Sequence, residues 1–271
     1  MARSRANPLD RALEAFADEL AEASRAILNA AGAAAPAVEM KEDASPVTAA
    51  DRRVEETLRS MIAERFPAHG ILGEEHGSTS PDAEYVWVID PIDGTLAFVA
   101  GVPVFGTLIG LAHEGRPLLG VIDHPRTADR WVGGPGRPTT WNRAPVRVRT
   151  GRGLAEAFLT TSNPDLFSAP ERRAFDRLRS AVQMTLYGAS CYAYGLLASG
   201  RTDIGIDGGF DIFDMLAPAA VIQGAGGVVT DWQGGAITLA WRGRVIAAGD
   251  PQLHRAALAR VGDVPFSSEF D

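Results

Sequence analysis

Hydrophobic residues recur along this chain with two periods, one typical of helices and one typical of strands. An early series at three-to-four spacing predicts a helix with one apolar face, made of Leu9, Leu13, Phe16, Leu20 and Ile27. Asn7-Pro8 favours its start and Gly32 its end. A second amphipathic helix is predicted from an N-cap at Thr48 to a stop at Pro67. Its Arg/Glu positions indicate a solvent-exposed face.

Short apolar, β-branched runs predict strands between and after these helices. The first half is expected to hold strands at 70–73, 85–90, 104–112, 118–123 and 130–132, and a Gly/Pro loop at 133–138. Beyond 150, strands at 154–161, 202–206, 228–232 and 244–248 alternate with helices at 170–180, 191–199, 214–224 and 251–260. Pro218 is tolerable only near the first turn of its helix. The mixture predicts a layered α/β (mixed α+β) fold in two halves, 1–150 and 151–271.

The segment from Trp87 to Thr95 carries the strongest chemical signal in the chain. An apolar strand there ends in two carboxylates, Asp90 and Asp93, which repel each other unless protons or cations lie between them. Hard oxygen ligands of this kind suit Mg²⁺, Mn²⁺ or Ca²⁺. Gly94 and Thr95 then open a predicted helix, whose free N–H groups can hold an anion. A metal beside an anion indicates phosphate chemistry.

An Asp-rich turn is the plain alternative, because Asp-Pro and Asp-Gly are ordinary turn dipeptides. Further acidic segments count against it. Glu74 and Glu75 follow an apolar strand, Asp214 lies in a predicted helix, and Asp51 lies in the first turn of another. The acidic residues thus recur in four parts of the chain, which makes an isolated Asp-rich turn the weaker interpretation.

This set of motifs resembles the inositol monophosphatase superfamily of Mg²⁺-dependent, lithium-sensitive phosphomonoesterases. The signature W-[IV]-[IV]-D-P-[IL]-D-G-T stands intact at 87–95, and the G-E-E element stands at 73–75. The second signature, usually W-D-x-A-A followed by G-G, keeps Asp214 and Gly226-Gly227 but has Phe213 in place of its Trp. The resemblance spans about Lys41 to Leu258 and implies an αβαβα sandwich with the metal site between its halves.

The resemblance also implies a role for each site residue. It implies two or three Mg²⁺ ions, held by Glu74, Asp90, the Ile92 carbonyl, Asp93 and Asp214, with Asp90 bridging two of them. Asp51 and Thr95 would orient the attacking water beside Glu74, making these three the catalytic residues. The amides of Gly94 and Thr95 would bind the phosphate. Glu75 would lie behind the ligands or form a weak third-site contact.

The substrate is less sharply indicated. Outside the first signature the chain is most similar to the histidinol-phosphate phosphatase branch, which implies hydrolysis of L-histidinol phosphate in histidine biosynthesis. It departs from that branch at Leu186 and Ser190, and at Asp211 near the second signature. Ser190, Asp207 and Asp211 are expected at the substrate pocket rim, as an acidic wall that favours an ammonium group. Asp211 is equally consistent with a helix cap.

Other substrates and other classes of function stay open. An inositol or broad sugar-phosphate phosphatase is the main alternative, and a non-catalytic regulatory relative is the remote one. The presence of all four metal carboxylates and of Thr95 speaks against the latter, since a decayed site would usually have lost one.

The composition indicates which classes of partner and which cellular compartment to expect. The net charge of −8 gives no basic footprint for nucleic acid, and no apolar run is long enough to span a membrane. The single cysteine, Cys191, lies in an apolar run and is expected to be a buried structural thiol in a reducing cytoplasm. We expect a homodimer that acts on a small phosphorylated metabolite.

Overall fold

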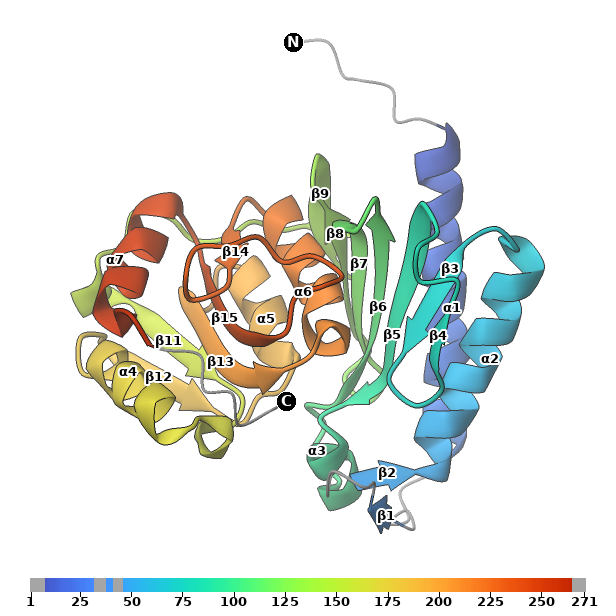
Figure 1. Ribbon diagram of the computed structural model, residues 1–271, viewed down its shortest axis with the longest axis horizontal. Coiled ribbons are helices and arrows are strands. Elements are labelled where there is room, and N and C mark those ends of the chain that lie inside the picture. Colours follow the sequence, from blue (N-terminus) through green and yellow to red (C-terminus); the bar gives the residue numbers. More distant parts are fainter. Residues whose placement is uncertain (1–7, 32–37, 41–45, 265–271) are drawn as a thin grey trace.

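Layers of helix and sheet alternate through the molecule, as Figure 1 shows. The computed structural model describes residues 8–31, 38–40 and 46–264. Among these residues the strands form an eight-stranded sheet, a five-stranded sheet and a small two-stranded sheet. Two helices cover the outer face of the large sheet, further helices lie between the large sheets, and others cover the outer face of the five-stranded sheet. This arrangement confirms the alternating layers predicted from the element pattern and the αβαβα sandwich that the resemblance implies.

The eight-stranded sheet forms the wall on which the site is built. Its strand order is β10-β9-β8-β7-β6-β5-β3-β4, antiparallel except where β3 runs parallel to β5. The strands are β3 (Gly70–Gly73), β4 (Gly77–Thr79), β5 (Tyr85–Asp93), β6 (Gly106–His113), β7 (Arg116–His124), β8 (Asp129–Gly134), β9 (Arg137–Trp141) and β10 (Ala144–Pro145). Central β5 is buried along most of its length, which explains its continuous apolar sequence.

Helices α1 (Pro8–Ala30) and α2 (Ala49–Arg65) pack side by side on the outer face of this sheet. Their apolar stripes form one core with the large sheet, in which Phe16 lies against Trp87. The predicted N-cap of the second helix is confirmed, because Thr48 accepts the N–H of Ala50. The short strands β1 (Val38–Met40) and β2 (Pro46–Thr48) pair just before α2, and α3 (Thr95–Ala100) follows β5.

The five-stranded sheet has the order β12-β11-β13-β15-β14 and combines parallel with antiparallel pairs. Its strands are β11 (Phe158–Thr161), β12 (Met184–Tyr187), β13 (Ile204–Phe210), β14 (Val228–Thr230) and β15 (Gly243–Ala248). The helices are α4 (Ala169–Arg179), α5 (Tyr192–Ala198), α6 (Ile212–Gly224) and α7 (Pro251–Val261). Helix α6 packs against both sheets, whereas α4 and α7 share a separate core on the outer face.

Most predicted elements are present, and the exceptions have physical causes. Residues 133–138 form the β8–β9 hairpin instead of a loop, because the turn needs only the two residues between Gly134 and Arg137. Pro218 lies inside α6 and not in its first turn. Asp211 is the N-cap, so the helix begins at Ile212, earlier than predicted. Pro218 has no N–H, and the helical hydrogen bond to the Asp214 carbonyl is therefore not formed.

The two predicted halves share a core. The eight-stranded sheet comes from residues before 150 and the five-stranded sheet from residues after it. However, α6 of the second half contributes Leu216 and Ala217 to the same cluster as Leu108 of the first. A division into separate domains stays a prediction. No helix in the described part of the chain is long and apolar enough to cross a membrane.

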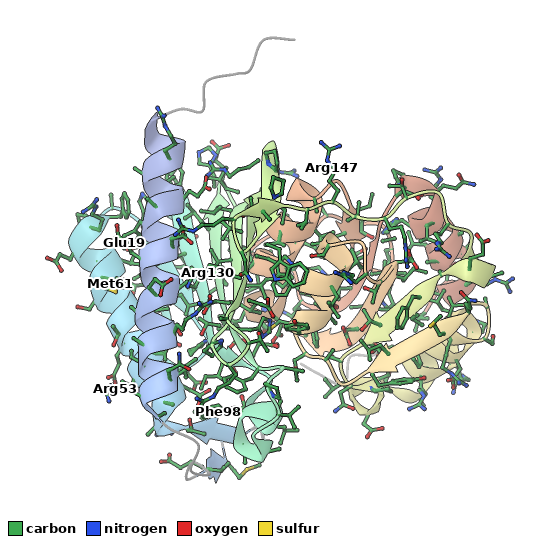
Figure 2. All side chains as sticks on the ribbon, turned by 180° about the vertical axis from the view of Figure 1, so that it is seen from behind. Glu19, Arg53, Met61, Phe98, Arg130 and Arg147 are labelled. Atoms are coloured by element: carbon green, nitrogen blue, oxygen red, sulfur yellow. The ribbon has the colours of Figure 1, made fainter. Side chains whose placement is uncertain are left out.

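A buried ion cluster fixes α1 on the sheet. Asp123 is fully buried in β7 and accepts hydrogen bonds from Arg25 of α1 at 2.5 and 3.1 Å and from Arg130 of β8 at 2.6 Å. Arg130 lies beside α1, where it also contacts Asp18 and Glu22 (Figure 2). The Asp123 carboxylate therefore bridges two guanidinium groups between the helix and the sheet, and Asp18 and Glu22 supply further negative charge.

We expect Asp123→Asn to destabilise the protein by about 3 kcal/mol, because removing one partner of a buried ion pair leaves the other charge uncompensated. Urea unfolding followed by circular dichroism measures this loss. Glu19→Gln, an exposed change on the same helix, serves as the control and should be neutral. Equal stability of the two variants would contradict the assignment.

Candidate active site

A bulge at the end of β5 turns its two carboxylates to the same side. Asp90 pairs with Leu108 and Asp93 with Gly106, so that three steps on β5 match two steps on β6. In a regular strand, residues three positions apart point to opposite faces. The extra residue removes that alternation and lets Asp90 and Asp93 converge. A buried chain of hydrogen bonds supports the bulge: Thr107 donates to the Pro91 carbonyl at 2.8 Å and contacts Ser24 at 2.6 Å.

Helix α6 brings the third carboxylate. Asp214 lies in the first turn of α6. Asp90, Asp93 and Asp214 each place one carboxylate oxygen within 4.8 Å of the oxygens of the other two. The orientation of Asp214 is fixed by a capping box, in which its carboxylate accepts the Asp211 N–H at 2.7 Å. Residues from two distant segments of the sequence therefore meet at one point between the sheets.

Electrostatics at this point disfavour three ionised carboxylates. Burial raises the pKa of Asp90 well above its ordinary value, and the nearby Glu74 and Asp93 raise it further. Burial also raises the pKa of Asp214 well above its ordinary value, and the repulsion from Asp93 adds to the effect. No arginine in the described residues forms an ion pair with this cluster. Within the described part of the chain, no arginine therefore offsets the charge of this cluster.

The donor set fits a divalent cation. Asp90 is 1% exposed, and its Oδ1 has no hydrogen-bond partner among the described residues. A buried carboxylate oxygen without a donor is costly, and a hard cation would satisfy it. Asp90, Asp93 and Asp214, with Glu74 beside them, offer the all-oxygen environment that Mg²⁺ or Mn²⁺ prefers.

A backbone N–H at the N-cap of α5 holds the Asp93 carboxylate in place. The backbone N–H of Cys191 donates to Asp93 Oδ2 at 2.7 Å, which opposes the rise in pKa that burial causes at Asp93. The Cys191 thiol is buried and lies 3.7 Å from His124 Nε2. Burial lowers the pKa of His124 to about 4, so this imidazole is neutral at physiological pH. The prediction of a buried Cys191 is confirmed.

The residues after Asp93 face the same site. Thr95 begins α3, and its hydroxyl donates to the Ile92 carbonyl at 3.1 Å, the carbonyl that the resemblance implies as a ligand. Gly94 is the N-cap of this short helix. Ser190 lies directly against it, since a Cβ at Gly94 would lie 2.6 Å from Ser190 Oγ. Gly94, which was predicted to bind phosphate, and Ser190, which was predicted to bind substrate, are therefore in contact.

Glu74 and Asp51 approach from the side of α2. Glu74 follows β3, and its N–H donates to the Ile89 carbonyl of β5 at 3.2 Å. Its charge contributes to the raised pKa of both Asp90 and Asp51, which places its carboxylate near them. Asp51 is 2% exposed, burial raises its pKa, and its carboxylate accepts two hydrogen bonds from Thr48.

The three predicted substrate residues differ in accessibility. Asp211 is exposed and caps α6, and Ser190 is partly exposed. Asp207, in contrast, is 1% exposed and lies beneath the surface instead of at a rim. Its carboxylate accepts hydrogen bonds from Thr161, Ser162 and Tyr194 between 2.6 and 2.9 Å. This geometry favours a supporting role for Asp207 and leaves Asp211 as the acidic side chain open to a ligand.

Sequence reasoning missed two supports of the site. Glu55 was assigned to a solvent-exposed face of α2, but its side chain is fully buried and contacts the turn after Glu74. Its spacing of four residues from Asp51, which places both on one helix face, was the available signal. The role of Thr107 could not be predicted from the sequence, because its hydroxyl contacts the Pro91 carbonyl only when β5 pairs with β6.

A groove of about 470 Å³ lies away from this site, between α1 and strands β8 and β9. It is lined by Glu14, Asp18, Glu22, Arg25, Arg130, Val132, Thr140, Asn142 and Arg143. Several of its charges pair with each other or with Asp123, including Arg130 with Glu22 at 2.9 Å. We therefore assign the chemistry to the carboxylate cluster and not to this groove.

Comparison with known proteins decides the family. A model of the inositol monophosphatase family matches residues 9–265, nearly the whole chain. The chain belongs to the inositol monophosphatase family. Among solved structures, an inositol monophosphatase from Zymomonas mobilis superposes with a TM-score of 0.85 at 39% identity, and the match covers 96% of this chain and 99% of that chain.

Two similar proteins, both phosphatases by name, indicate the class of reaction. The chloroplastic bifunctional phosphatase IMPL2 of Arabidopsis thaliana is 46% identical over 227 residues, which span 80% of this chain and 66% of that protein. The histidinol-phosphatase of Chlorobaculum parvum is 34% identical over 218 residues, which span 80% of this chain and 84% of that protein. This inositol monophosphatase family member is accordingly a phosphoric monoester hydrolase.

The buried Asp207 makes a pH-dependent contribution to stability. Burial raises its pKa from 3.8 to about 6. A raised carboxyl pKa means that the folded state binds the proton more tightly than the unfolded state. The resulting stabilisation is present below pH 3.8 and is lost as the pH rises through about 6, by about 3 kcal/mol in total.

We expect Asp207→Asn to remove this loss, so that the variant gains stability relative to the wild type as the pH rises from 4 to 6. An amide can still accept the hydrogen bonds from Thr161 and Ser162. Denaturant unfolding at several pH values measures the difference, with Asp165→Asn, an exposed carboxylate, as the control. Parallel stability curves for Asp207→Asn and the wild type would contradict the assignment.

Proposed function

We propose that this chain is a Mg²⁺-dependent phosphatase that hydrolyses L-histidinol phosphate. The observation that carries the metal dependence is the cluster of Asp90, Asp93 and Asp214, in which one oxygen of the buried Asp90 has no hydrogen-bond donor among the residues that the structure describes. A phosphate dianion cannot approach such a cluster unless cations intervene. The substrate is supported by the family relatives and by the accessible Asp211.

Each carboxylate has a place in this proposal. Glu74, Asp90 and the Ile92 carbonyl would hold one cation, and Asp90, Asp93 and Asp214 a second, with a third ion possible near Glu75. When bound, such cations neutralise phosphate oxygens, acidify a water and stabilise the leaving alkoxide. Inhibition by Li⁺, which is similar in size to Mg²⁺ but carries one charge, belongs to the same proposal.

The remaining residues would orient the reactants. Thr95 is anchored through its hydroxyl to the Ile92 carbonyl, so its oxygen is fixed beside the cluster and can accept a hydrogen bond from the attacking water. Asp51, buried and fixed by Thr48, would accept a hydrogen bond from the same water. The amides of Gly94 and Thr95 would donate to the phosphate.

Asp211 supports histidinol phosphate as the substrate. This side chain is exposed at the start of α6, three residues from Asp214, where it can face the organic part of a bound phosphate ester. Histidinol phosphate carries an ammonium group that a carboxylate can pair with, whereas inositol phosphate offers only hydroxyls. The alternative, an inositol or broad sugar-phosphate phosphatase, is favoured by the similarity to the Zymomonas mobilis structure.

We further propose a homodimer in the cytoplasm. The edge strand β12 carries two large apolar side chains that are about half exposed, Met184 at 49% and Tyr187 at 46%. An exposed apolar strand edge is usually covered in natural proteins, and a second copy of the chain would cover it.

Metal dependence is tested by chelation and by one substitution. We expect phosphatase activity to vanish in excess chelator and to return with Mg²⁺. Asp90→Asn should lower kcat by several orders of magnitude, because it removes the charge shared between both cation sites. Asp165→Asn is the matched control and should retain activity. Full activity of the chelated wild type would overturn the metal-based mechanism.

Substrate choice is tested by Asp211→Asn. Asparagine is as good an N-cap as aspartate, so the helix start should be preserved while the charge is lost. We expect KM for histidinol phosphate to rise more than KM for inositol 1-phosphate, since only the amine loses a charge partner. A clearly higher kcat/KM of the wild type for inositol 1-phosphate would reverse the ranking of the two substrates.

A further inference from the structure

The turn that carries Glu74 is held on both sides by hydrogen bonds. It links β3 to β4 and contains Glu74, Glu75 and His76. On one side the Glu74 N–H donates to the Ile89 carbonyl, one residue before Asp90. On the other side the next two N–H groups of the turn point into α2. The position of Glu74 relative to Asp90 therefore depends on what α2 offers to this turn.

Helix α2 offers one fully buried carboxylate, that of Glu55. Glu55 Oε2 accepts the N–H of Glu75 at 2.7 Å, and Oε1 accepts the N–H of His76 at 3.0 Å. Because each of the two carboxylate oxygens accepts one of two consecutive backbone N–H groups, the carboxylate fixes the path of the backbone in this turn. Charged acceptors also form stronger hydrogen bonds than neutral ones.

Two neighbours keep the Glu55 carboxylate in place. Arg59, one turn later on α2, donates to Glu55 Oε1 at 2.7 Å and also contacts the Gly77 carbonyl and Thr79 of β4. Gly73 allows the close approach, since a Cβ there would lie 2.0 Å from Glu55 Oε1. Glu55 and Arg59 thus clamp the turn from Gly73 to Thr79 against α2.

We propose that Glu55 is a positioning residue that sets the affinity of the site for its divalent cation by fixing the Glu74 turn beside Asp90. This inference rests on the proposed metal-dependent function. Glu55 faces the turn and not the carboxylate cluster, so it acts through Glu74. Its position four residues after Asp51 means that a single helix face supports both the water-orienting residue and the turn.

The test measures metal binding in the absence of substrate. Isothermal titration of Mg²⁺ and Mn²⁺ into the protein is compared for the wild type, Glu55→Gln and Glu64→Gln. A Gln side chain turns one acceptor into a donor, which opposes one of the two backbone N–H groups. Glu64→Gln makes the same change of charge on the same helix, at an exposed residue near its C-terminal end.

We expect Glu55→Gln to weaken the binding of the cation by about tenfold or more, the usual effect of losing a group that orients a ligand. Saturating Mg²⁺ should then restore most of kcat, whereas Glu64→Gln should match the wild type throughout. Glu55→Asp keeps the charge but shortens the reach, and its affinity should also fall. Gly73→Ala, whose Cβ would displace the Glu55 carboxylate, is the second variant to measure if Glu55→Gln does not fold.

Specific results would overturn the inference. A folded Glu55→Gln variant, or Gly73→Ala in its place, that binds the cation as tightly as the wild type would show that Glu55 serves folding alone. If Asp90→Asn abolishes binding in the same titration, the metal site stands and only the role of Glu55 falls. If the wild type binds no divalent cation, the proposed function falls, and the inference falls with it.

Discussion

Repulsion among buried carboxylates is the constraint on which the rest of this structure depends. Asp90, Asp93 and Asp214 offer oxygens within 4.8 Å of one another in a site with little solvent, and Glu74 adds a further charge. Charges of one sign at this distance raise each other's pKa and destabilise the folded state unless a cation offsets them. On the proposed function, this inositol monophosphatase family member uses some of its stability to hold a site that a divalent cation would complete.

Each carboxylate is held by a different local device. The β5 bulge turns Asp90 and Asp93 together, the capping box of α6 fixes Asp214, and the N–H of Cys191, the N-cap residue of α5, anchors Asp93. Glu55 fixes the turn that carries Glu74. These devices come from both sides of the interface between the sheets, so the site needs both halves of the chain. Rigid support of this kind keeps the reacting groups aligned without reorganisation.

The sequence predicted the layers, most elements and the residues that converge, because long apolar strands and an uninterrupted signature are local signals. It did not predict how they converge. Asp90 to Asp93 read as a strand end followed by a turn, since the bulge is defined only by the partner strand β6. Glu55 read as a surface residue because burial of a charge depends on the distant turn it binds. Asp207 was expected at the rim because its hydrogen bonds to Thr161 and Tyr194 are non-local.

Anomalous diffraction from a crystal of this protein soaked in Mn²⁺ tests the central claim most directly. The account predicts two anomalous peaks between β5 and α6, both coordinated by Asp90, with Glu74 on one and Asp214 on the other. It also predicts that Asp93 keeps its hydrogen bond from the Cys191 N–H. Absence of any peak at this cluster, with the carboxylates instead paired to a cationic side chain, would contradict the account.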